Sequence, residues 1–278
     1  MGGAEVWWAI ESSCAEWGRE NGAVMHTSWN QVMGSLVMSV ATVAAVCPQT
    51  AEASLIEHLD LAEMLLATVM PSTNSYGDPT QITWEGSNGL THSTNRSKCA
   101  TLVTQLFEKA YNPDYVAWFG CTSPHAASYH DAIEVEHGFT LIESIHDVQP
   151  GDIIAIQYID AGCTNLTCGT FSTCTSTGHV AMVADYPKAR TASAPLVSGT
   201  TQYSIDIIDT STSYHGLADT RYKSDVGGSN DQGVGQGTMR LYVNPKDSTI
   251  VGHSWSTSSG SAFYGNAKRD VVIGRYAG

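Results

Sequence analysis

The sequence predicts an α+β fold in which helices come first and strands follow. Apolar residues recur at helical spacing in two segments before residue 112. After residue 147, short apolar runs bounded by turn residues replace them. A chain that groups its helices apart from its strands is typical of α+β proteins rather than of alternating α/β units. With 278 residues, 42% of them hydrophobic, it has enough apolar material for a core.

The first 53 residues are predicted to be a signal peptide with an N-terminal extension. Residues 32–47 are almost wholly apolar or small, Pro48 follows, and residues 51–53 have the small-x-small form that signal peptidases cleave. The alternative is a buried helix, because the run is short for a membrane span. Cleavage after Ala53 leaves residues 54–278 as a single domain, secreted or held in the periplasm or cell envelope, with no stable membrane span.

Two helices and five strands are expected in the remaining chain. Helical spacing of leucines predicts a helix over residues 54–69, ended by Pro71. A second helix is predicted over residues 97–111, with Ser97, or Asn95 before it, as the N-cap. Apolar runs and turn residues predict strands at 153–158, 178–184, 203–208, 239–242 and 271–275.

The charge balance excludes one class of partner. The chain carries 13 lysines and arginines against 27 aspartates and glutamates, a formal net charge of −14. A surface this acidic repels phosphate backbones, so nucleic-acid binding is not expected.

Cys99 is the candidate nucleophile. It falls in the first turn of the second predicted helix, where the helix dipole and unpaired backbone N–H groups lower the pKa of a thiol. Arg96 and Lys98 are expected to add to that effect. A thiolate is the nucleophile that acyl transfer needs. The alternative is a buried structural cysteine.

His179 and Asp209 are the candidate partners of this thiol. His179 opens one predicted strand and Asp209 closes a later one. If the two strands pair as an antiparallel hairpin, residue 179 lies opposite residue 209, and the carboxylate fixes the imidazole tautomer. A slip of one residue in this register would separate them.

Three motifs resemble those of the NlpC/P60 and CHAP-type cysteine hydrolases. They are the Cys-helix segment at 97–103, the Pro-Gly-Asp turn at 149–154 and the Gly-His-Val strand at 177–183. The resemblance implies a papain-like α+β fold, with the nucleophile at the start of a helix packed on an antiparallel sheet that carries the histidine and a polar third residue. Asp209 occupies the place of that third residue.

The resemblance also implies a reaction. Cys99 attacks an amide carbonyl, His179 passes a proton to the leaving amine, and water releases the acyl-enzyme. The backbone N–H of Cys99 donates to the oxyanion, and a second donor comes from upstream, with Thr94, Asn95 and Ser97 as candidates. No metal or cofactor is expected.

The substrate implied by the resemblance is the peptide part of peptidoglycan. A general peptidase or an acyltransferase would use the same residues, and a non-catalytic wall- or partner-binding module would keep the fold without activity. The chain departs from the family pattern in three places: Lys98 replaces the usual aspartate, a Cys-rich insertion spans about 160–177, and a C-terminal strand extension follows residue 215.

The remaining cysteines of the exported domain suggest disulfides. In an oxidising compartment, two bridges among four cysteines leave Cys99 free; the four are Cys121, Cys163, Cys168 and Cys174. The alternative is a zinc site, since Cys163, Cys168, Cys174 and His179 have the spacing C-x4-C-x5-C-x4-H.

Other polar residues are assigned to the surface or to structural roles. Asp219 and Arg221 are expected to form a structural ion pair, and residues 233–237, with three glycines, are expected to mark a turn before a strand. Five histidines without metal-ligand spacing are expected at the surface or in loops: His130, His137, His146, His215 and His253.

Overall fold

The computed structural model describes residues 57–161, 176–223 and 229–278. These residues belong to one compact unit that spans Gln49–Gly278. The predicted signal segment and three of the predicted disulfide cysteines, Cys163, Cys168 and Cys174, lie outside the described residues. Over the described ranges, no helix is long and apolar enough to cross a membrane.

The elements come in the order that the sequence predicts, with helices before the main strands. The α-helices are α2 (Glu57–Thr68), α3 (Cys99–Ala110), α4 (Tyr115–Phe119) and α5 (Ala126–Glu134). Short 3-10 turns are η1 (Pro71–Thr73), η2 (Ser87–Gly89) and η3 (Ile159–Ala161). The strands before α3 are β1 (Asn74–Tyr76), β2 (Gln81–Thr83) and β3 (Thr94–Ser97).

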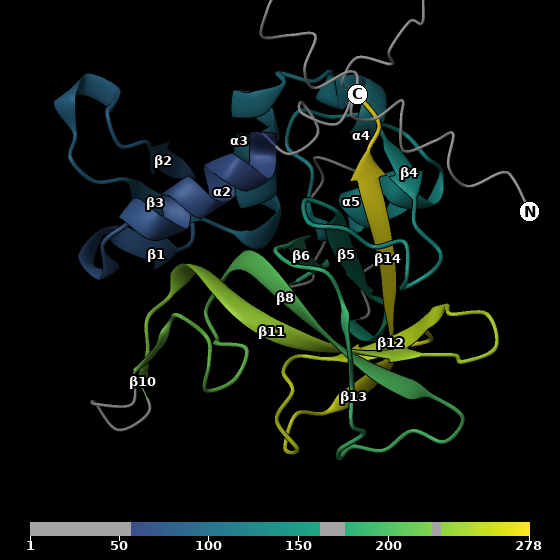
Figure 1. Ribbon diagram of the computed structural model, residues 1–278. Helices are drawn as coiled ribbons and strands as arrows, with labels where there is room; N and C mark the ends of the chain where they lie inside the picture. The colour runs from purple at the N-terminus through teal and green to yellow at the C-terminus, as the bar shows by residue number, and fades with distance from the viewer. Residues whose placement is uncertain (1–56, 162–175, 224–228) are drawn as a thin grey trace, which may run out of the picture. The chain divides into compact units, whose positions relative to one another are not determined.

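The remaining strands follow α5. They are β4 (Phe139–Leu141), β5 (Ile153–Tyr158), β6 (Gly178–Val183), β7 (Lys188–Arg190), β8 (Thr201–Ser211), β9 (Tyr222–Lys223), β10 (Ser229–Asn230), β11 (Gly233–Val243), β12 (Ile250–Ser254), β13 (Phe263–Gly265) and β14 (Arg269–Tyr276). Figure 1 shows the long strands β8 and β11 running side by side, as their register requires.

The main sheet is antiparallel throughout its described ladders. Its strand order is β13-β12-β11-β8-β6-β5-β14-β4, with β7 pairing with β8 beside this path. A three-stranded sheet, β1-β3-β2, and a two-stranded sheet, β10-β9, complete the arrangement. The predicted α+β class is therefore confirmed.

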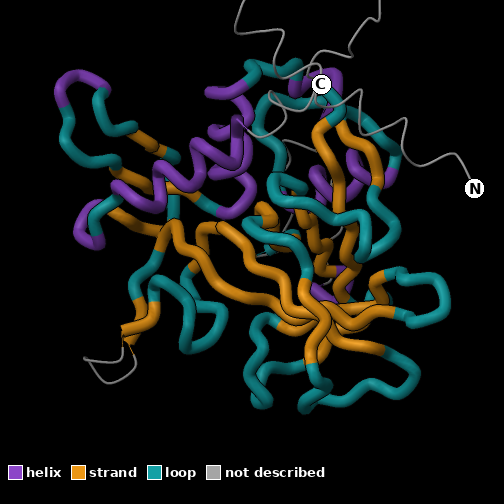
Figure 2. The backbone as a smooth tube through the Cα atoms, in the orientation of Figure 1, coloured by secondary structure: helices purple, strands orange, loops and turns teal. Residues whose placement is uncertain are grey.

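Two apolar cores cover the two faces of the main sheet. Along β5, Ile153 and Ala155 face the core shared with α2, α3 and α5, while Ile154 and Ile156 face the second core. Because successive strand residues point to opposite faces, a strand buried on both faces needs an unbroken apolar run. Figure 2 shows most of the helical segments, in purple, above the long strands in orange.

Two predicted boundaries differ from the structure. Helix α3 begins at Cys99 with Lys98 as its N-cap, whereas Ser97 is the last residue of β3. Lys98 donates its backbone N–H to Thr101 Oγ1 at 2.9 Å, so the threonine at the third helical position satisfies the N-cap backbone. The glycine-rich segment 233–237 is not a turn, because it forms the first half of β11.

Candidate active site

Cys99 is a buried, free thiol at the first position of α3. Its side chain is 7% exposed, and no disulfide involves it. Backbone N–H groups of Ala100 and Val180 donate to its sulfur. The helix start and β6 therefore both supply partial positive charge where a thiolate forms.

A chain of side-chain hydrogen bonds fixes the start of α3 against the main sheet. Ser97 Oγ donates to Asn95 Oδ1 at 2.7 Å, and Asn95 Nδ2 donates to Asn74 Oδ1 at 2.8 Å. The Asn74 amide then exchanges two 2.8 Å hydrogen bonds with the backbone of Val234 in β11. Asn95 and Ser97 are buried behind Cys99 and do not line the cleft. Their side chains hydrogen-bond to one another and to Asn74, so they support the start of α3.

His179 reaches the thiol from the start of β6. Its Nε2 lies 2.7 Å from Asp209 Oδ2, which leaves Nδ1 for the hydrogen bond between His179 and Cys99. The preceding residue must be glycine: Gly178 has a φ of +150°, and a Cβ there would lie 1.9 Å from the carbonyl oxygen of Ile156. The structure thus brings together Cys99, His179 and Asp209.

The strand register behind this contact is shifted by two residues from the expected one. Strand β6 pairs with β8 at Met182 opposite Ile208 and at Val183 opposite Ile207, so residue 179 aligns with residue 211 instead of 209. A shift of two residues keeps every side chain on its original face, whereas a shift of one would not. His179 therefore meets Asp209 as a diagonal neighbour, within reach on the same face.

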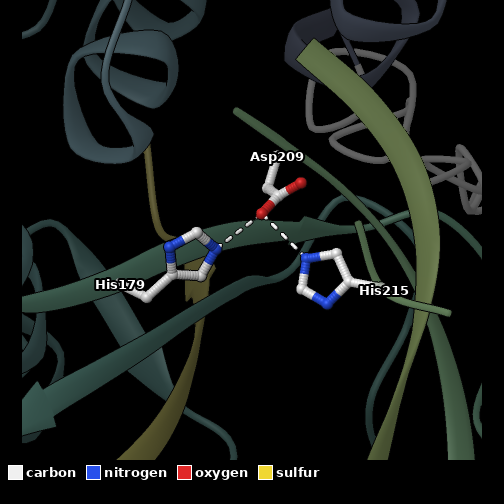
Figure 3. A group of neighbouring side chains, drawn as sticks. All are labelled: His179, Asp209 and His215. Carbon is white, nitrogen blue, oxygen red and sulfur yellow. Dashed lines mark hydrogen bonds and ion pairs between the residues drawn. The ribbon is translucent and has the colours of Figure 1, made fainter. Parts of the chain in front are cut away.

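Asp209 is the centre of a buried charge cluster. Figure 3 shows both His179 and His215 pointing at one oxygen of its carboxylate. His215 Nε2 lies 3.0 Å from Asp209 Oδ2, and Arg221 Nη2 lies 2.8 Å from Oδ1. Asp209 is buried, which alone raises its pKa, but the charges of His215 and Arg221 and the hydrogen bond from His179 bring the pKa well below the usual range.

His215 is held between two acceptors and an aromatic ring. Its Nδ1 lies 2.6 Å from the carbonyl oxygen of Trp255, and its Nε2 faces Asp209. The imidazole ring also stacks on the Trp255 ring, at 4.0 Å between centroids. These contacts fix the position of His215 beside the Asp209 carboxylate.

Arg221 and Asp219 form the predicted ion pair, and it supports the site. Arg221 Nε and Nη2 donate to the two oxygens of Asp219 at 2.9 and 2.8 Å. The same Asp219 carboxylate accepts the backbone N–H of His215 at 2.7 Å. This bidentate pair therefore fixes both Arg221 and His215, which face Asp209.

Three glycines of β11 make room for this support. A Cβ at Gly233 would lie 2.1 Å from Asn74 Oδ1, one at Gly235 would lie 2.5 Å from Arg221 Nε, and one at Gly237 would lie 2.4 Å from Asp219 Oδ2. Their spacing of two places them on one face of the strand. The segment thus provides a bare surface on which the polar side chains pack.

The pKa values of Cys99 and His179 move in opposite directions. Burial raises the pKa of the thiol, but the charge of His179 and its hydrogen bond outweigh burial and lower it. Burial lowers the pKa of the imidazole, but the Cys99 charge and the Asp209 hydrogen bond raise it to about 9. A lowered thiol pKa beside a raised imidazole pKa favours the thiolate–imidazolium form, in which the sulfur is nucleophilic.

A cleft opens on both sides of this pair. On the Cys99 side it has a volume of about 300 Å³ and is bordered by Lys98 and Asp78, which form an ion pair. On the His179 side it is about 320 Å³. Tyr76, Ser176 and Gly178 border both halves, so a chain-like substrate crossing the thiol contacts each in turn.

The expected surface or loop position of the five histidines is wrong for two of them, His130 in α5 and His253 in β12, while His215 lies in a loop but is buried. His130, His215 and His253 are buried, whereas His137 and His146 are exposed. Burial lowers the pKa of His253 to about 3, with the charges of Arg269, His179 and His215 adding to this effect. Sequence spacing missed His215, although it lies only six residues beyond Asp209, because spacing alone does not show that the chain turns back.

Cys121 is disulfide-bonded. The other three cysteines of the expected disulfide set, and of the alternative zinc site, lie outside the described residues. Ligand atoms of His179, Asp209 and His215 lie within 4.8 Å of one another, close enough for a metal ion. A metal is disfavoured there because the Arg221 guanidinium already neutralises the Asp209 carboxylate, and a buried cation repels a second one.

The fold and this site define an α+β protein with a buried Cys–His–Asp line at the floor of a cleft. Among curated proteins, the chain is similar to uncharacterized protein R653 of Acanthamoeba polyphaga mimivirus, at 31% identity over 201 residues. The aligned region covers 69% of this chain and 82% of the viral protein. The chain belongs to the family of that protein. No family model matches it, and no solved structure matches it.

Proposed function

We propose that the protein is a papain-like cysteine hydrolase that cleaves amide bonds. The observation that carries this proposal is the hydrogen-bonded line from Cys99 through His179 to Asp209, with the thiol bordering a cleft. A structural cysteine needs neither a lowered pKa nor an imidazole partner fixed by a carboxylate. Both features are what acyl transfer by a thiol requires.

In the proposed reaction, the Cys99 thiolate attacks the carbonyl carbon of a substrate amide. His179 Nδ1–H transfers its proton to the nitrogen of the leaving amine, and the C–N bond breaks to leave a thioester. Water, deprotonated by the now neutral imidazole, hydrolyses the thioester and restores the thiolate and imidazolium. Asp209 holds the ring by accepting from Nε2 and stays ionised throughout.

Two donors are proposed for the oxyanion. One is the backbone N–H of Cys99, at the start of α3. The other is the Tyr76 hydroxyl rather than Asn95 or Ser97, whose side chains are bonded behind the cysteine. Tyr76 borders both halves of the cleft, and burial together with the nearby Cys99 charge raises its pKa, so the phenol keeps its proton.

The proposed substrate class is peptide, with peptidoglycan stem or cross-bridge peptides first by resemblance to NlpC/P60 and CHAP enzymes. Export is part of the proposal, and the disulfide at Cys121 supports it because disulfides persist in oxidising compartments. A general peptidase or an acyltransferase would use the same three residues, Cys99, His179 and Asp209. Only the reaction products distinguish these activities from hydrolysis of peptidoglycan peptides.

The test is mass spectrometry of products from wild-type protein and a Cys99→Ala variant incubated with muropeptides and with unrelated peptides. We expect new amino termini with the wild type and none with the variant. Transfer of the acyl group to an added amine instead of water would identify an acyltransferase. Equal binding by both proteins, with no cleavage by either, would contradict the hydrolase and favour a binding module.

A further inference from the structure

Arg269 is held rigidly between two aromatic rings at the His179 side of the cleft. It is the cross-strand partner of Tyr158, and its guanidinium lies 4.2 Å from the centre of that ring. The ring of Tyr264 covers the other side at 3.7 Å. With its side chain only 23% exposed, the guanidinium is fixed in position by stacking.

One donor of this guanidinium has no hydrogen-bond partner among the residues that the structure describes. The atom is Nε, which is buried. Asp160 is the carboxylate paired with it, but its Oδ1 lies 3.5 Å from Nε, longer than an ordinary hydrogen bond. Arg221 shows the opposite arrangement, with donors bound to Asp219 and to the carbonyl oxygen of Gly233. A buried donor without a partner is costly unless something binds it.

Arg269 and the candidate nucleophile influence the same neighbours. Burial raises the pKa of Tyr158 to about 12, while the charges of Arg269 and Cys99 act on it with opposite signs. His253 is kept neutral by burial and by the charges of Arg269 and His179. Arg269 and His179 also border the same half of the cleft, so one small substrate bound there can contact both.

We propose that Arg269 binds a carboxylate of the substrate, so that the enzyme selects amides with a carboxylate close to the scissile bond. This inference rests on the proposed hydrolase function and names its substrate class. A planar guanidinium matches a carboxylate through two parallel N–H···O bonds. Trp255 and Tyr264 border this half of the cleft beside the guanidinium. Because the chain has a net charge of −14, its overall field repels anionic substrates. Binding of a carboxylate at the cleft therefore requires a local positive charge, which Arg269 provides.

The test compares two alkylating probes of equal shape, iodoacetyl-glycine and iodoacetyl-glycinamide. In both probes an amide follows the reactive carbon, and a terminal group follows that amide at the same distance. The terminal group is a carboxylate in iodoacetyl-glycine and a neutral carboxamide in iodoacetyl-glycinamide. The rate of modification of Cys99 is followed by peptide mapping in the wild type and in Arg269→Gln. The matched control is Arg96→Gln, which makes the same change at an exposed position outside the cleft lining.

We expect the wild type to react faster with iodoacetyl-glycine than with the glycinamide. Arg269→Gln should lower the ratio of the two rates about ten-fold, the size of a charge-assisted hydrogen bond, with the glycinamide rate nearly unchanged. Arg96→Gln should keep the wild-type ratio. A wild-type ratio below one, or a ratio unchanged in Arg269→Gln, would overturn the carboxylate site.

A second measurement needs no variant. N-acetylglycine should protect wild-type Cys99 from iodoacetamide, and N-acetylglycinamide at equal concentration should not. Equal protection, or none by either, would contradict the proposal. These outcomes are separate from failure of the hydrolase function, in which Cys99 would react with the neutral probe no faster than an ordinary thiol.

Discussion

Two histidine–carboxylate clusters in this molecule use the same residue types in different ways. The buried cluster consists of His179, Asp209, His215 and Arg221, with contacts of 2.7, 3.0 and 2.8 Å to one carboxylate. The second cluster, called the rim cluster because its carboxylates reach the protein surface, consists of His130 and three carboxylates that lie 3.4 to 3.7 Å from its ring nitrogens: Asp131, Glu134 and Asp270. The first surrounds one carboxylate with two histidines and an arginine, and the second surrounds one histidine with three carboxylates.

The difference lies in exposure and in what each cluster can do. Asp209 is fully buried as a side chain, whereas those of Asp131, Glu134 and Asp270 are 55, 49 and 29% exposed. Water screens the rim cluster, so its charges are weakly coupled. The charges of the buried cluster compensate one another, and the histidine at its edge faces a thiol. Proximity of histidine to carboxylates therefore indicates a site only where the group is shielded from water and its charges compensate one another.

The largest expected effect comes from removing the charge at the centre of the buried cluster. Asp209→Asn leaves Arg221 and His215 buried beside a neutral amide, and uncompensated buried charge costs about 3–5 kcal/mol of the free energy of unfolding. Urea unfolding at neutral pH measures it. A loss under about 1 kcal/mol would mean that the cluster is not tightly coupled.

The second-largest effect on stability is expected from substitution of a β11 glycine that packs against the buried cluster. In Gly237→Ala, the new Cβ would meet Asp219 Oδ2 at 2.4 Å and displace the pair that fixes Arg221, at a cost of about 1–3 kcal/mol. Gly260→Ala is the matched control, because its nearest neighbour is 4.0 Å away, and a change within about 0.5 kcal/mol is expected. Equal effects of the two substitutions in thermal or urea unfolding would contradict the supporting role of β11.

The free energy of unfolding is expected to depend on pH through the protonation of His179. Its pKa is raised from 6.5 to about 9, so the folded state binds its proton more tightly than the unfolded state. The stabilisation is fully present below pH 6.5 and is lost as pH rises through about 9. The difference in unfolding free energy between wild type and His179→Gln should therefore shrink by about 1–3 kcal/mol between pH 6 and pH 10. A constant difference across this range would be inconsistent with a proton held by Cys99 and Asp209.

The smallest effect is expected at the rim cluster. Asp270→Asn removes one of three carboxylates around His130 and should change the free energy of unfolding by less than about 1 kcal/mol, since the group is partly exposed and screened. Raising the salt concentration should reduce even this difference. A loss as large as that of Asp209→Asn would erase the distinction between the clusters.

Local patterns predicted the longest helices and strands, because the causes of these elements are local. The apolar run of β5 and the helical stripe of α3 need no knowledge of distant residues. The position of Cys99 at a helix start and of His179 at a strand start followed from the same patterns. Short elements such as α5 and β13 were missed because nine and three residues carry little periodicity.

The support of the site depends on contacts that sequence spacing does not contain. Asn74 reaches Val234 across 160 positions, and His215 reaches the Trp255 carbonyl across 40. The two-residue change in the β6–β8 register likewise follows from packing rather than from the strand patterns. One available signal was the alternation of glycines in residues 233–237, which fits one bare face of a strand better than a turn.

The proposed thiolate–imidazolium pair of Cys99 and His179 is tested most directly by the pH dependence of Cys99 alkylation. Alkylation by iodoacetamide is followed by peptide mapping in wild type and His179→Ala. We expect fast alkylation that persists below pH 7 in the wild type, because the pKa of the thiol is lowered, and slower alkylation that rises only near pH 8.5 in the variant. Alkylation of the wild type that follows an ordinary thiol, or is unchanged in the variant, would contradict it.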